Sequence, residues 1–336
     1  MKILSIDGGG IRGIIPAIIL AEIENRLGKP IAELFDLIAG TSTGGILAVG
    51  LTKPYPLNPQ QPQYDAEDLV KMYREEGDRI FYEPLHERFT KVDDLMKPKY
   101  SSAGRGEILE EYLRDVTLEK ALTSVMLTSY DIELRMPIFF VSDRSSEIIG
   151  EGFRKIGTGF TMKQAAMATS AAPTFFEPYH LPTVQAKSGF YTLVDGGVVA
   201  NNPTSLAIME TIISSKKAGD KLDIDEILVV SLGTGSLTRR YPYEEARNWG
   251  LISWAEPIVN ILMDVNSESV ASQLEQLLPP MQGYPKKYYR FQVPLTEAND
   301  DMDDASPKNI KNLEKLAHQL IAEKHYEIDS LCEMLK

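Results

Sequence analysis

Short apolar runs and longer segments with helical spacing alternate along the first fifty residues. The run KILSI (2–6) is apolar and rich in β-branched residues, which predicts a buried strand. A helical pattern follows over about residues 14–27 and ends near Gly28. The run FDLIA (35–39) predicts a second strand, and the small-residue segment 45–51 predicts a second helix. This repeated order is typical of a parallel sheet covered by helices.

The remaining chain continues the alternation and ends in helices. Helical patterns occupy about residues 65–80, 105–122, 160–171, 205–217 and the stretch from Pro307. Apolar runs predict strands at 125–134, 137–142, 190–194 and 226–235. Residues 53–64 are rich in Pro and Gln and predict a loop, and residues 297–304 form an acidic loop.

No internal repeat and no linker divide the chain. We therefore expect a single domain over residues 1–336, with a C-terminal helical extension at about 305–336. The expected fold class is α/β, a three-layer α/β/α arrangement around a central, mostly parallel sheet.

Composition limits the possible functions. The 336 residues are 43% hydrophobic and 25% charged, which is sufficient for an ordinary core. Lys and Arg number 35 against 48 Asp and Glu, so the net charge is −13. Such a surface disfavours nucleic-acid binding and gives no general attraction to anionic membranes. A lipid substrate would have to be reached through apolar contacts or a local basic patch.

Cysteine content and apolar run length indicate the compartment. The single cysteine, Cys332, can form neither an intrachain disulfide nor a cysteine-based metal site. The N-terminus leads directly into a predicted strand without the features of a signal peptide, and the apolar runs are far too short to span a membrane. We expect a soluble, cytoplasmic protein that contacts membranes only peripherally.

The motif Gly40-Thr41-Ser42-Thr43-Gly44 has the form of a nucleophile elbow. The serine of such an elbow lies in a tight turn from strand to helix, and side chains two residues away on either side would collide there. The N-terminus of the following helix favours a developing oxyanion. The motif follows an apolar run and opens a helical pattern, as an elbow requires. An ordinary glycine-rich turn is the alternative interpretation.

A second glycine motif, DGGGIRG, covers residues 7–13. Consecutive Gly8, Gly9 and Gly10 offer unhindered backbone N–H groups, which could bind the oxyanion of an acyl-transfer reaction. A cation at Arg12, in the first turn of a helix, is unfavourable for the helix dipole. Arg12 could instead bind an anionic head group, orient the glycine loop, or lie on the surface.

The same stretch also matches the dinucleotide-binding pattern G-x-G-x-x-G through Gly8, Gly10 and Gly13. That pattern requires an acidic residue at the end of the second strand, roughly 20 residues on. The acid of this strand, Asp36, lies at its beginning, and the charge of Asp7 would oppose a pyrophosphate. A dehydrogenase is the main rival function because of this match, and both observations count against it.

A serine nucleophile needs a base within hydrogen-bonding reach. His318 and His325 lie in a charged helical pattern, and His86 lies in a charged segment. His180, between Tyr179 and Leu181, stays a candidate base. None of them follows a late strand end. Asp195, which ends the strand FYTLV, is the better candidate, since Gly196 and Gly197 allow another backbone to approach closely.

These motifs, in this order, resemble the patatin-like phospholipase family. The match includes DGGGIRG, GTSTG and VDGG, and extends to the segments 168–173, 231–235 and 302–306. The likeness to plant patatins is close, but VVANNP after VDGG is a form common in bacterial members. The resemblance implies a lipid acyl hydrolase of the phospholipase A or lysophospholipase type, with a Ser42–Asp195 dyad and an acyl-enzyme intermediate. It further implies an oxyanion hole from Gly8, Gly9 and Gly10 beside Arg12, with neither metal nor other cofactor.

The expected partner is a lipid or phospholipid, met in transient contact with a membrane surface. Residues 162–172 and the Phe175–Phe176 pair are candidate walls of an acyl groove, although plain core is the alternative. Residues 53–64 could form a lid or an ordinary surface loop. A single-carboxylate base predicts no histidine-like limb near ~6.5 in the pH profile. A storage role and a regulated effector phospholipase are the other competing functions.

Overall fold

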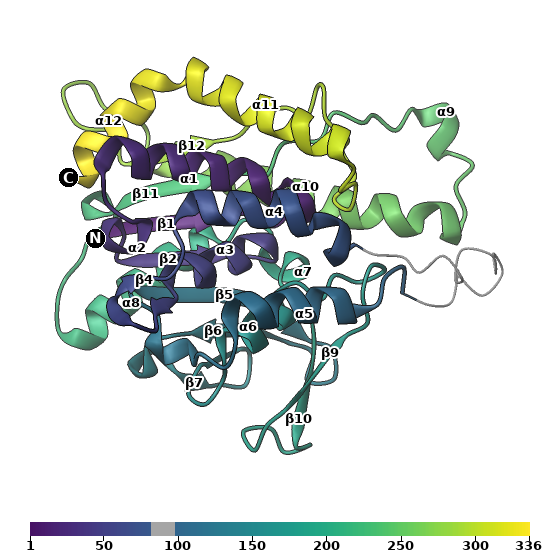
Figure 1. The fold of residues 1–336 in the computed structure, drawn as a ribbon, viewed down its shortest axis with the longest axis horizontal. Helices are drawn as coiled ribbons and strands as arrows, with labels where there is room; N and C mark the ends of the chain where they lie inside the picture. Colours follow the sequence, from purple (N-terminus) through teal and green to yellow (C-terminus); the bar gives the residue numbers. More distant parts are fainter. Residues whose placement is uncertain (82–97) are drawn as a thin grey trace.

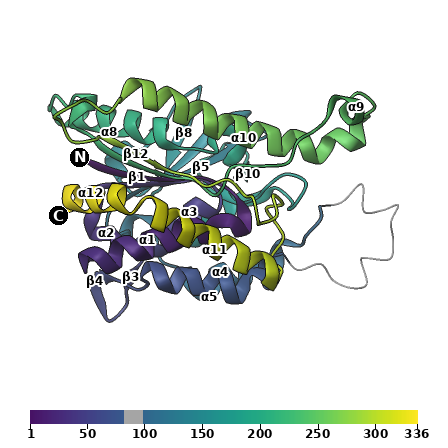
Figure 2. The same cartoon turned by 90° about the horizontal axis from the view of Figure 1, so that it is seen from above.

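A mixed β-sheet lies between two layers of helices in the computed structural model, which describes residues 1–81 and 98–336 (Figure 1). Two helices, α8 (Thr204–Ala218) and α10 (Leu251–Leu277), cover one face of the sheet (Figure 2). The other face is covered by α1 (Ile14–Leu27), α3 (Thr43–Thr52), α4 (Ala66–Ile80), α5 (Ser102–Leu113), α6 (Met162–Thr169) and α11 (Pro307–Glu323). The three-layer α/β/α fold expected from the sequence is confirmed.

Parallel strands form the half of the sheet in which the chain begins. In spatial order they are β12 (Tyr288–Phe291), β11 (Leu228–Leu232), β1 (Lys2–Ile6), β2 (Leu37–Gly40) and β5 (Ser124–Asp131). The neighbours in this run are all parallel, so their carboxyl ends meet at one edge of the sheet, where open α/β sheets bind their ligands.

Antiparallel pairing dominates the other half of the sheet. There β5 pairs with β6 (Met136–Val141), β6 pairs with β8 (Arg154–Ile156), and β8 pairs with β7 (Ile148–Ile149). Off this path, β10 (Phe190–Asp195) pairs antiparallel with β5 and with β9 (Tyr179–Pro182). The runs 125–134 and 137–142 are neighbouring strands, as their sequence predicts.

The parallel strands are apolar because both of their faces are buried. Along β1, Leu4 packs into the core beneath α1 and α3, whereas Ile3 packs into the core beneath α8 and α10. Ile38 and Leu37 divide in the same way in β2. This two-sided burial holds the sheet edge that carries the glycine motifs in a fixed position.

Two predicted boundaries differ from the structure. The helix expected over 105–122 is α5, which ends at Leu113 because Arg114 adopts a φ of 51°. The stretch expected as a loop at 53–64 contains the antiparallel pair β3 (Pro54–Tyr55) and β4 (Asn58–Pro62). Its prolines are tolerated because a two-stranded ribbon leaves many backbone N–H groups unpaired.

The C-terminal helices α11 and α12 (His325–Leu335) pack against α1, so both chain ends lie on the same side of the molecule (Figure 1). Lys2 Nζ donates to Leu335 O over 2.8 Å and ties the ends together. The short helices are α2 (Ile31–Leu34), α7 (Gly197–Ala200) and α9 (Tyr243–Ala246). Of the helices described, none is long and apolar enough to cross a membrane.

Candidate active site

Ser42 lies in the turn between β2 and α3 with a φ of 55° and a ψ of −120°. This left-handed backbone is strained for a residue with a side chain, as expected of a nucleophile elbow. A Cβ on Gly40 would lie 2.2 Å from Gly44 O, and one on Gly44 would lie 2.2 Å from Ile6 O. Both glycines of the motif are therefore required by close backbone contacts.

Hydrogen bonds of the two threonines of the motif hold the turn in place. Thr41 Oγ1 lies 2.7 Å from both Thr128 Oγ1 and Ala200 O. Thr43 Oγ1 is hydrogen-bonded to the Tyr73 hydroxyl. All of these groups are buried, so the elbow is held by a satisfied polar network.

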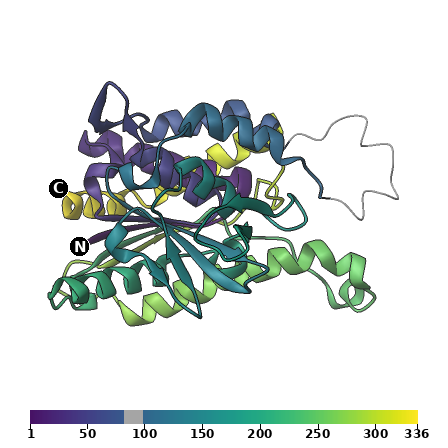
Figure 3. The same cartoon turned by 90° about the horizontal axis from the view of Figure 1, so that it is seen from below.

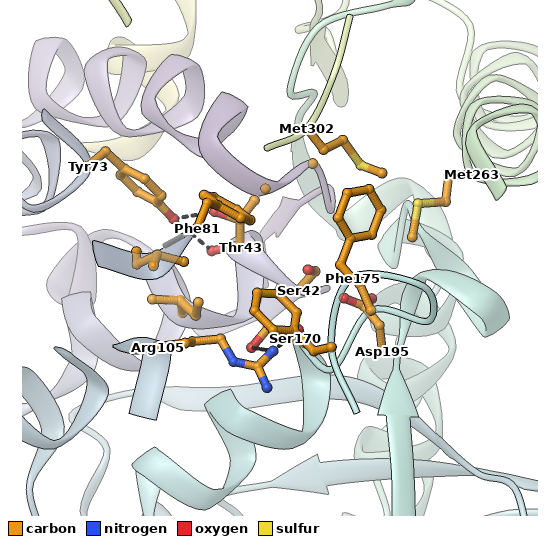
Figure 4. Close-up of a pocket in the computed structure, with 16 residues that line it drawn as sticks. Ser42, Thr43, Tyr73, Phe81, Arg105, Ser170, Phe175, Asp195, Met263 and Met302 are labelled. Carbon is orange, nitrogen blue, oxygen red and sulfur yellow. Dashed lines mark hydrogen bonds between the residues drawn. The ribbon is translucent and has the colours of Figure 1, made fainter. Parts of the chain in front are cut away.

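Asp195 reaches Ser42 because β2 and β10 meet end to end. β6 pairs with β5 from Met126 to Asp131 and occupies one edge of that strand. On the other edge, β2 pairs with residues 124–127 and β10 pairs antiparallel with residues 129–131. Since β10 runs opposite to β2, the carboxyl ends of the two strands point at each other. Ser42 and Asp195 consequently line the same pocket (Figure 4).

The end of α6 and the residues after it, 169–171, bridge the two strand ends. Thr169 Oγ1 accepts a hydrogen bond of 2.9 Å from Ser42 N, while Thr169 O accepts one of 3.1 Å from Gly196 N. Ala171 O accepts a further bond of 2.9 Å from Asp195 N. A Cβ on Gly196 would lie 2.3 Å from Thr128 O, which explains the glycine after Asp195. Sequence reasoning assigned this segment only to a pocket wall and missed its bridging role.

The carboxylate of Asp195 is fully buried and only half satisfied. Its Oδ1 accepts a hydrogen bond of 2.7 Å from Gly197 N, but its Oδ2 has no hydrogen-bond partner among the described residues. Burial raises the pKa of Asp195 to about 6, against the opposing effects of the Ser42 hydroxyl, Gly197 N–H and the charge of Arg105. The Ser42 hydroxyl is close enough to influence this pKa, although no Ser42–Asp195 bond meets hydrogen-bond geometry in the described structure.

The N–H groups of the glycine loop differ in their surroundings. Gly8 N donates to Asn201 O over 3.0 Å, and Gly8 is not among the lining residues. Gly8 O accepts from Thr234 Oγ1 over 2.7 Å, and Gly9 O accepts from Arg12 Nε over 3.2 Å. In a trans peptide the N–H points away from the carbonyl. The N–H groups of Gly9 and Gly10 are thus turned away from these anchored carbonyls, and both glycines line the pocket.

Arg12 orients the glycine loop, which was one of its three possible roles. It is only 5% exposed, so a surface position is excluded. Besides Gly9 O, it binds Asp300 O over 3.1 Å. Burial lowers the pKa of Arg12 to about 10, partly offset by Asp300. The acidic loop also holds Gly10, because Ile11 N donates to Met302 O over 2.9 Å.

The pocket itself is mainly apolar. Phe81, Phe175 and Phe176 line it together with Met263 and Met302, and the Phe175 ring lies on the same side of Ser42 as the two methionines (Figure 4). The Phe175–Phe176 pair is therefore a wall, as the sequence suggested. Most of α6 belongs to the core instead, and only Ser170 and Ala172 of the stretch 162–172 reach the pocket. No residue of 53–64 lines it, so the lid interpretation of that stretch is wrong.

Arg105, a charged residue that lines the pocket together with Asp195, was missed by sequence reasoning. It extends from α5, is 1% exposed, and its guanidinium carbon lies 4.1 Å from the centre of the Phe176 ring. It donates to the carbonyl and hydroxyl oxygens of Ser170. Burial lowers the pKa of Arg105 to about 10, while the charge of Asp195 raises it. A charged residue near the start of a helical pattern resembles a solvated one, so no sequence signal indicated that Arg105 is buried.

None of the histidines that lie within the described residues lines the pocket. His180 lies on β9, exposed, with its ring 4.5 Å from that of Phe190. His318 and His325 are exposed on α11 and α12. His86 lies outside the described residues. Of the titratable acids in residues 1–81 and 98–336, Asp195 is the best placed to act as a base for Ser42, since both residues line one pocket.

The dinucleotide-binding interpretation fails on the geometry. Asp36 accepts from Lys2 N over 2.7 Å, at the edge of the sheet opposite the glycine loop. Asp7 forms a buried ion pair of 2.7 Å with Arg290 instead of facing a ligand. No acidic residue ends β2, so the ribose contact of that motif is missing. In the described part of the chain, no cluster of His, Cys, Asp or Glu could hold a metal ion.

The chain is similar in sequence to known proteins. The family model described as Patatin-like phospholipase matches residues 4–208. Patatin-like protein 2 of Oryza sativa subsp. indica is 33% identical over 357 residues, covering 98% of this chain and 85% of its own length. Probable inactive patatin-3-Kuras 1 of Solanum tuberosum is 31% identical, with 96% and 86% coverage. The human GIVD cytosolic phospholipase A2 has a TM-score of 0.49 at 11% identity, and this chain spans 60% of its length.

A strained serine at a strand-to-helix turn, facing an apolar pocket, characterises a carboxylic ester hydrolase. The family model and the relatives define the class further as a lipid acyl hydrolase. The chain belongs to the patatin-like phospholipase family.

Replacing Asp195 by Asn should stabilise the fold at neutral pH. An unfolded aspartate titrates near ~3.9, whereas burial raises the folded pKa to about 6. The folded state therefore binds the proton more tightly, and the contribution of Asp195 to wild-type stability falls as the pH rises from about 4 to about 6. We expect Asp195→Asn to gain on the order of 2 kcal/mol at pH 7, and almost nothing at pH 4.

Urea unfolding of both proteins at the two pH values measures this difference. Glu323→Gln, at an exposed carboxylate, is the matched control and should stay within ~0.5 kcal/mol of wild type. A gain of equal size at pH 4 and pH 7 would show that the buried charge is not its cause.

Proposed function

We propose that this protein cleaves fatty-acyl esters of phospholipids or lysophospholipids through a Ser42–Asp195 dyad and an acyl-enzyme intermediate. The observation that carries the proposal is the end-to-end meeting of β2 and β10, which brings Ser42 and Asp195 into one pocket. The unpartnered Oδ2 of Asp195 is a buried acceptor that a catalytic base would need.

Acylation begins when Asp195 Oδ2 accepts the proton of Ser42 Oγ. As Oγ bonds to the ester carbonyl carbon, the π-electron pair moves onto the carbonyl oxygen. The N–H groups of Gly9 and Gly10 donate to this oxyanion, and Thr43 N–H at the start of α3 is a further donor. Each such donor typically contributes about 2.7–4 kcal/mol to transition-state stabilisation.

Collapse of the tetrahedral intermediate breaks the bond to the alcohol. The leaving oxygen takes the proton from Asp195, and the acyl group remains on Ser42. Asp195 then removes a proton from water, which attacks the acyl carbonyl within the same oxyanion hole. The fatty acid leaves as Ser42 Oγ recovers the proton, so the dyad returns to its starting state.

The environment of Asp195 makes a weak base stronger. An ordinary aspartate, with a pKa near ~3.9, removes a serine proton poorly. Burial raises the pKa of Asp195 to about 6, which brings it nearer to the working pH. The cation of Arg105 opposes this shift, and we infer that it keeps Asp195 ionised in neutral solution.

The acyl chain would occupy the apolar pocket beside the three phenylalanines and two methionines. The groups that line this pocket come from distant segments: residues 9–10, 42–46, 170–176, Asp195 and Met302. Because the site needs all of these segments, we propose that residues 1–336 act as one domain, with the C-terminal helices packed on α1 as its extension.

Hydrolysis of p-nitrophenyl esters of increasing chain length tests the proposed function. Wild type should hydrolyse them with a preference for longer chains, because the pocket is apolar. Ser42→Ala and Asp195→Ala should each lower kcat/KM by about a thousandfold or more, with folding checked by circular dichroism. Unchanged turnover in Ser42→Ala would refute the mechanism. A wild type without turnover on any ester or phospholipid would favour a storage role.

The pH dependence gives a second test. The sequence alone predicted no limb near the histidine range, but the burial of Asp195 changes this expectation. The proposed base must be ionised, so kcat/KM should fall as the pH drops through about 6. The same limb should persist in His180→Ala and in His86→Ala. Loss of activity in either variant, with the fold intact, would identify a histidine base and refute the Ser42–Asp195 dyad.

A further inference from the structure

An exposed apolar stripe runs along the first half of α10. It consists of Leu251, Trp254, Ile258, Leu262 and Val265, whose side chains are 38% to 94% exposed. Their spacing of three or four residues places them on one face of the helix. Between them and the sheet, Asn260, Met263 and Ser267 are buried on the opposite face. The stripe is therefore the outward face of an otherwise packed helix.

The apolar character stops where α10 passes over α8. Beyond Val265 the exposed residues are Glu268, Ser269, Ser272, Gln273, Glu275, Gln276 and Leu277, and those that continue the stripe at its own spacing are Ser269, Ser272 and Gln276. One helix thus carries an apolar outer face over one half and a polar outer face over the other. Ordinary scatter of apolar residues on a surface does not produce such a division.

The apolar half lies beside the candidate active site. Met263, on the inner face of this half, lines the same pocket as Ser42 and Asp195 (Figure 4). The start of α10 and the neighbouring α9 project beyond the sheet on the side of its carboxyl ends (Figures 2 and 3). The stripe therefore extends outward from the pocket that holds the proposed nucleophile.

Aromatic side chains gather at the projecting tip. Trp249 lies 5.2 Å from Tyr241 and 5.0 Å from Trp254, as measured between ring centroids. These are both of the tryptophans in the chain. Tryptophan and tyrosine favour the boundary between lipid head groups and acyl chains, because their rings are apolar but carry a polar group.

We propose that the stripe and its aromatic tip dock the protein on a lipid surface with neutral head groups, from which acyl chains enter the pocket. The partner follows from the charge. The stripe, residues 251–265, contains no Lys or Arg, and the whole chain carries a net charge of −13. Of the three arginines beside the tip, Arg239 and Arg247 are paired with Asp301 and Glu244. Contact with this surface depends on apolar burial rather than on attraction to anionic lipids. The proposal rests on the proposed function, since a lipid hydrolase must contact its substrate assembly.

Vesicles of phosphatidylcholine test the docking directly, in a Ser42→Ala background that leaves the lipid intact. Because both tryptophans lie at the tip, their emission should shift to the blue on binding. Leu262→Glu should weaken vesicle binding at least tenfold. Gln276→Glu lies on the same face fourteen residues further along, about 21 Å away, and should bind as the parent does. Raising the salt concentration should leave the binding unchanged.

Turnover of a short, soluble p-nitrophenyl ester separates this proposal from the catalytic one. Leu262→Glu with native Ser42 should keep that turnover and lose at least tenfold on phosphatidylcholine vesicles. Equal losses on both substrates would overturn the docking role. So would the absence of a blue shift, tighter binding to anionic vesicles, or a dimer in light scattering that Leu262→Glu converts to a monomer. Loss of soluble turnover in Ser42→Ala would uphold the nucleophile in each of these cases.

Discussion

The arrangement of the site depends on the hydrogen bonds by which residues 169–171 join two strand ends. β2 and β10 meet head to head along one edge of β5, so no ladder of backbone bonds connects them. Thr169 and Ala171 supply the connection, binding Ser42 N on one side and the backbone of Asp195 and Gly196 on the other. Since Arg105 in turn binds Ser170, the bridge, the serine, the carboxylate and the buried cation form one unit. A small shift of this segment would separate the two proposed catalytic groups.

Stability is given up at several points around this unit. Ser42 has a strained backbone, Asp195 has a buried oxygen without a partner in the described structure, and Arg12 and Arg105 are buried cations. Each feature is unfavourable in isolation, and the packed sheet with its two apolar cores compensates for them. All of them lie at the carboxyl edge of the sheet. The opposite edge, where Asp36 and the β3–β4 ribbon lie, contributes nothing to the pocket. This distribution is what a functional site built at the cost of local stability should look like.

The features that sequence reasoning predicted are local ones. The elbow motif and the glycine after Asp195 were recognised from short sequence patterns, and apolar periodicity located the main strands and helices. The contacts with Ile6 O and Thr128 O that require Gly44 and Gly196 come from other strands. The features it missed depend on topology. Nothing in the sequence shows that β10 continues the line of β2, that residues 169–171 bridge them, or that Arg105 turns inward from α5. The glycine loop illustrates the difference, because only its contact with Asn201 shows that Gly8 N–H is already occupied.

The central claim is that Ser42 forms the covalent bond to the acyl group. A long-chain alkyl fluorophosphonate, which reacts with activated serines, tests it when the labelled peptides are mapped by mass spectrometry. The account predicts one adduct per chain, located on Ser42, absent from Ser42→Ala and formed far more slowly in Asp195→Asn. An adduct on a different residue, or labelling that persists in Ser42→Ala, would contradict it.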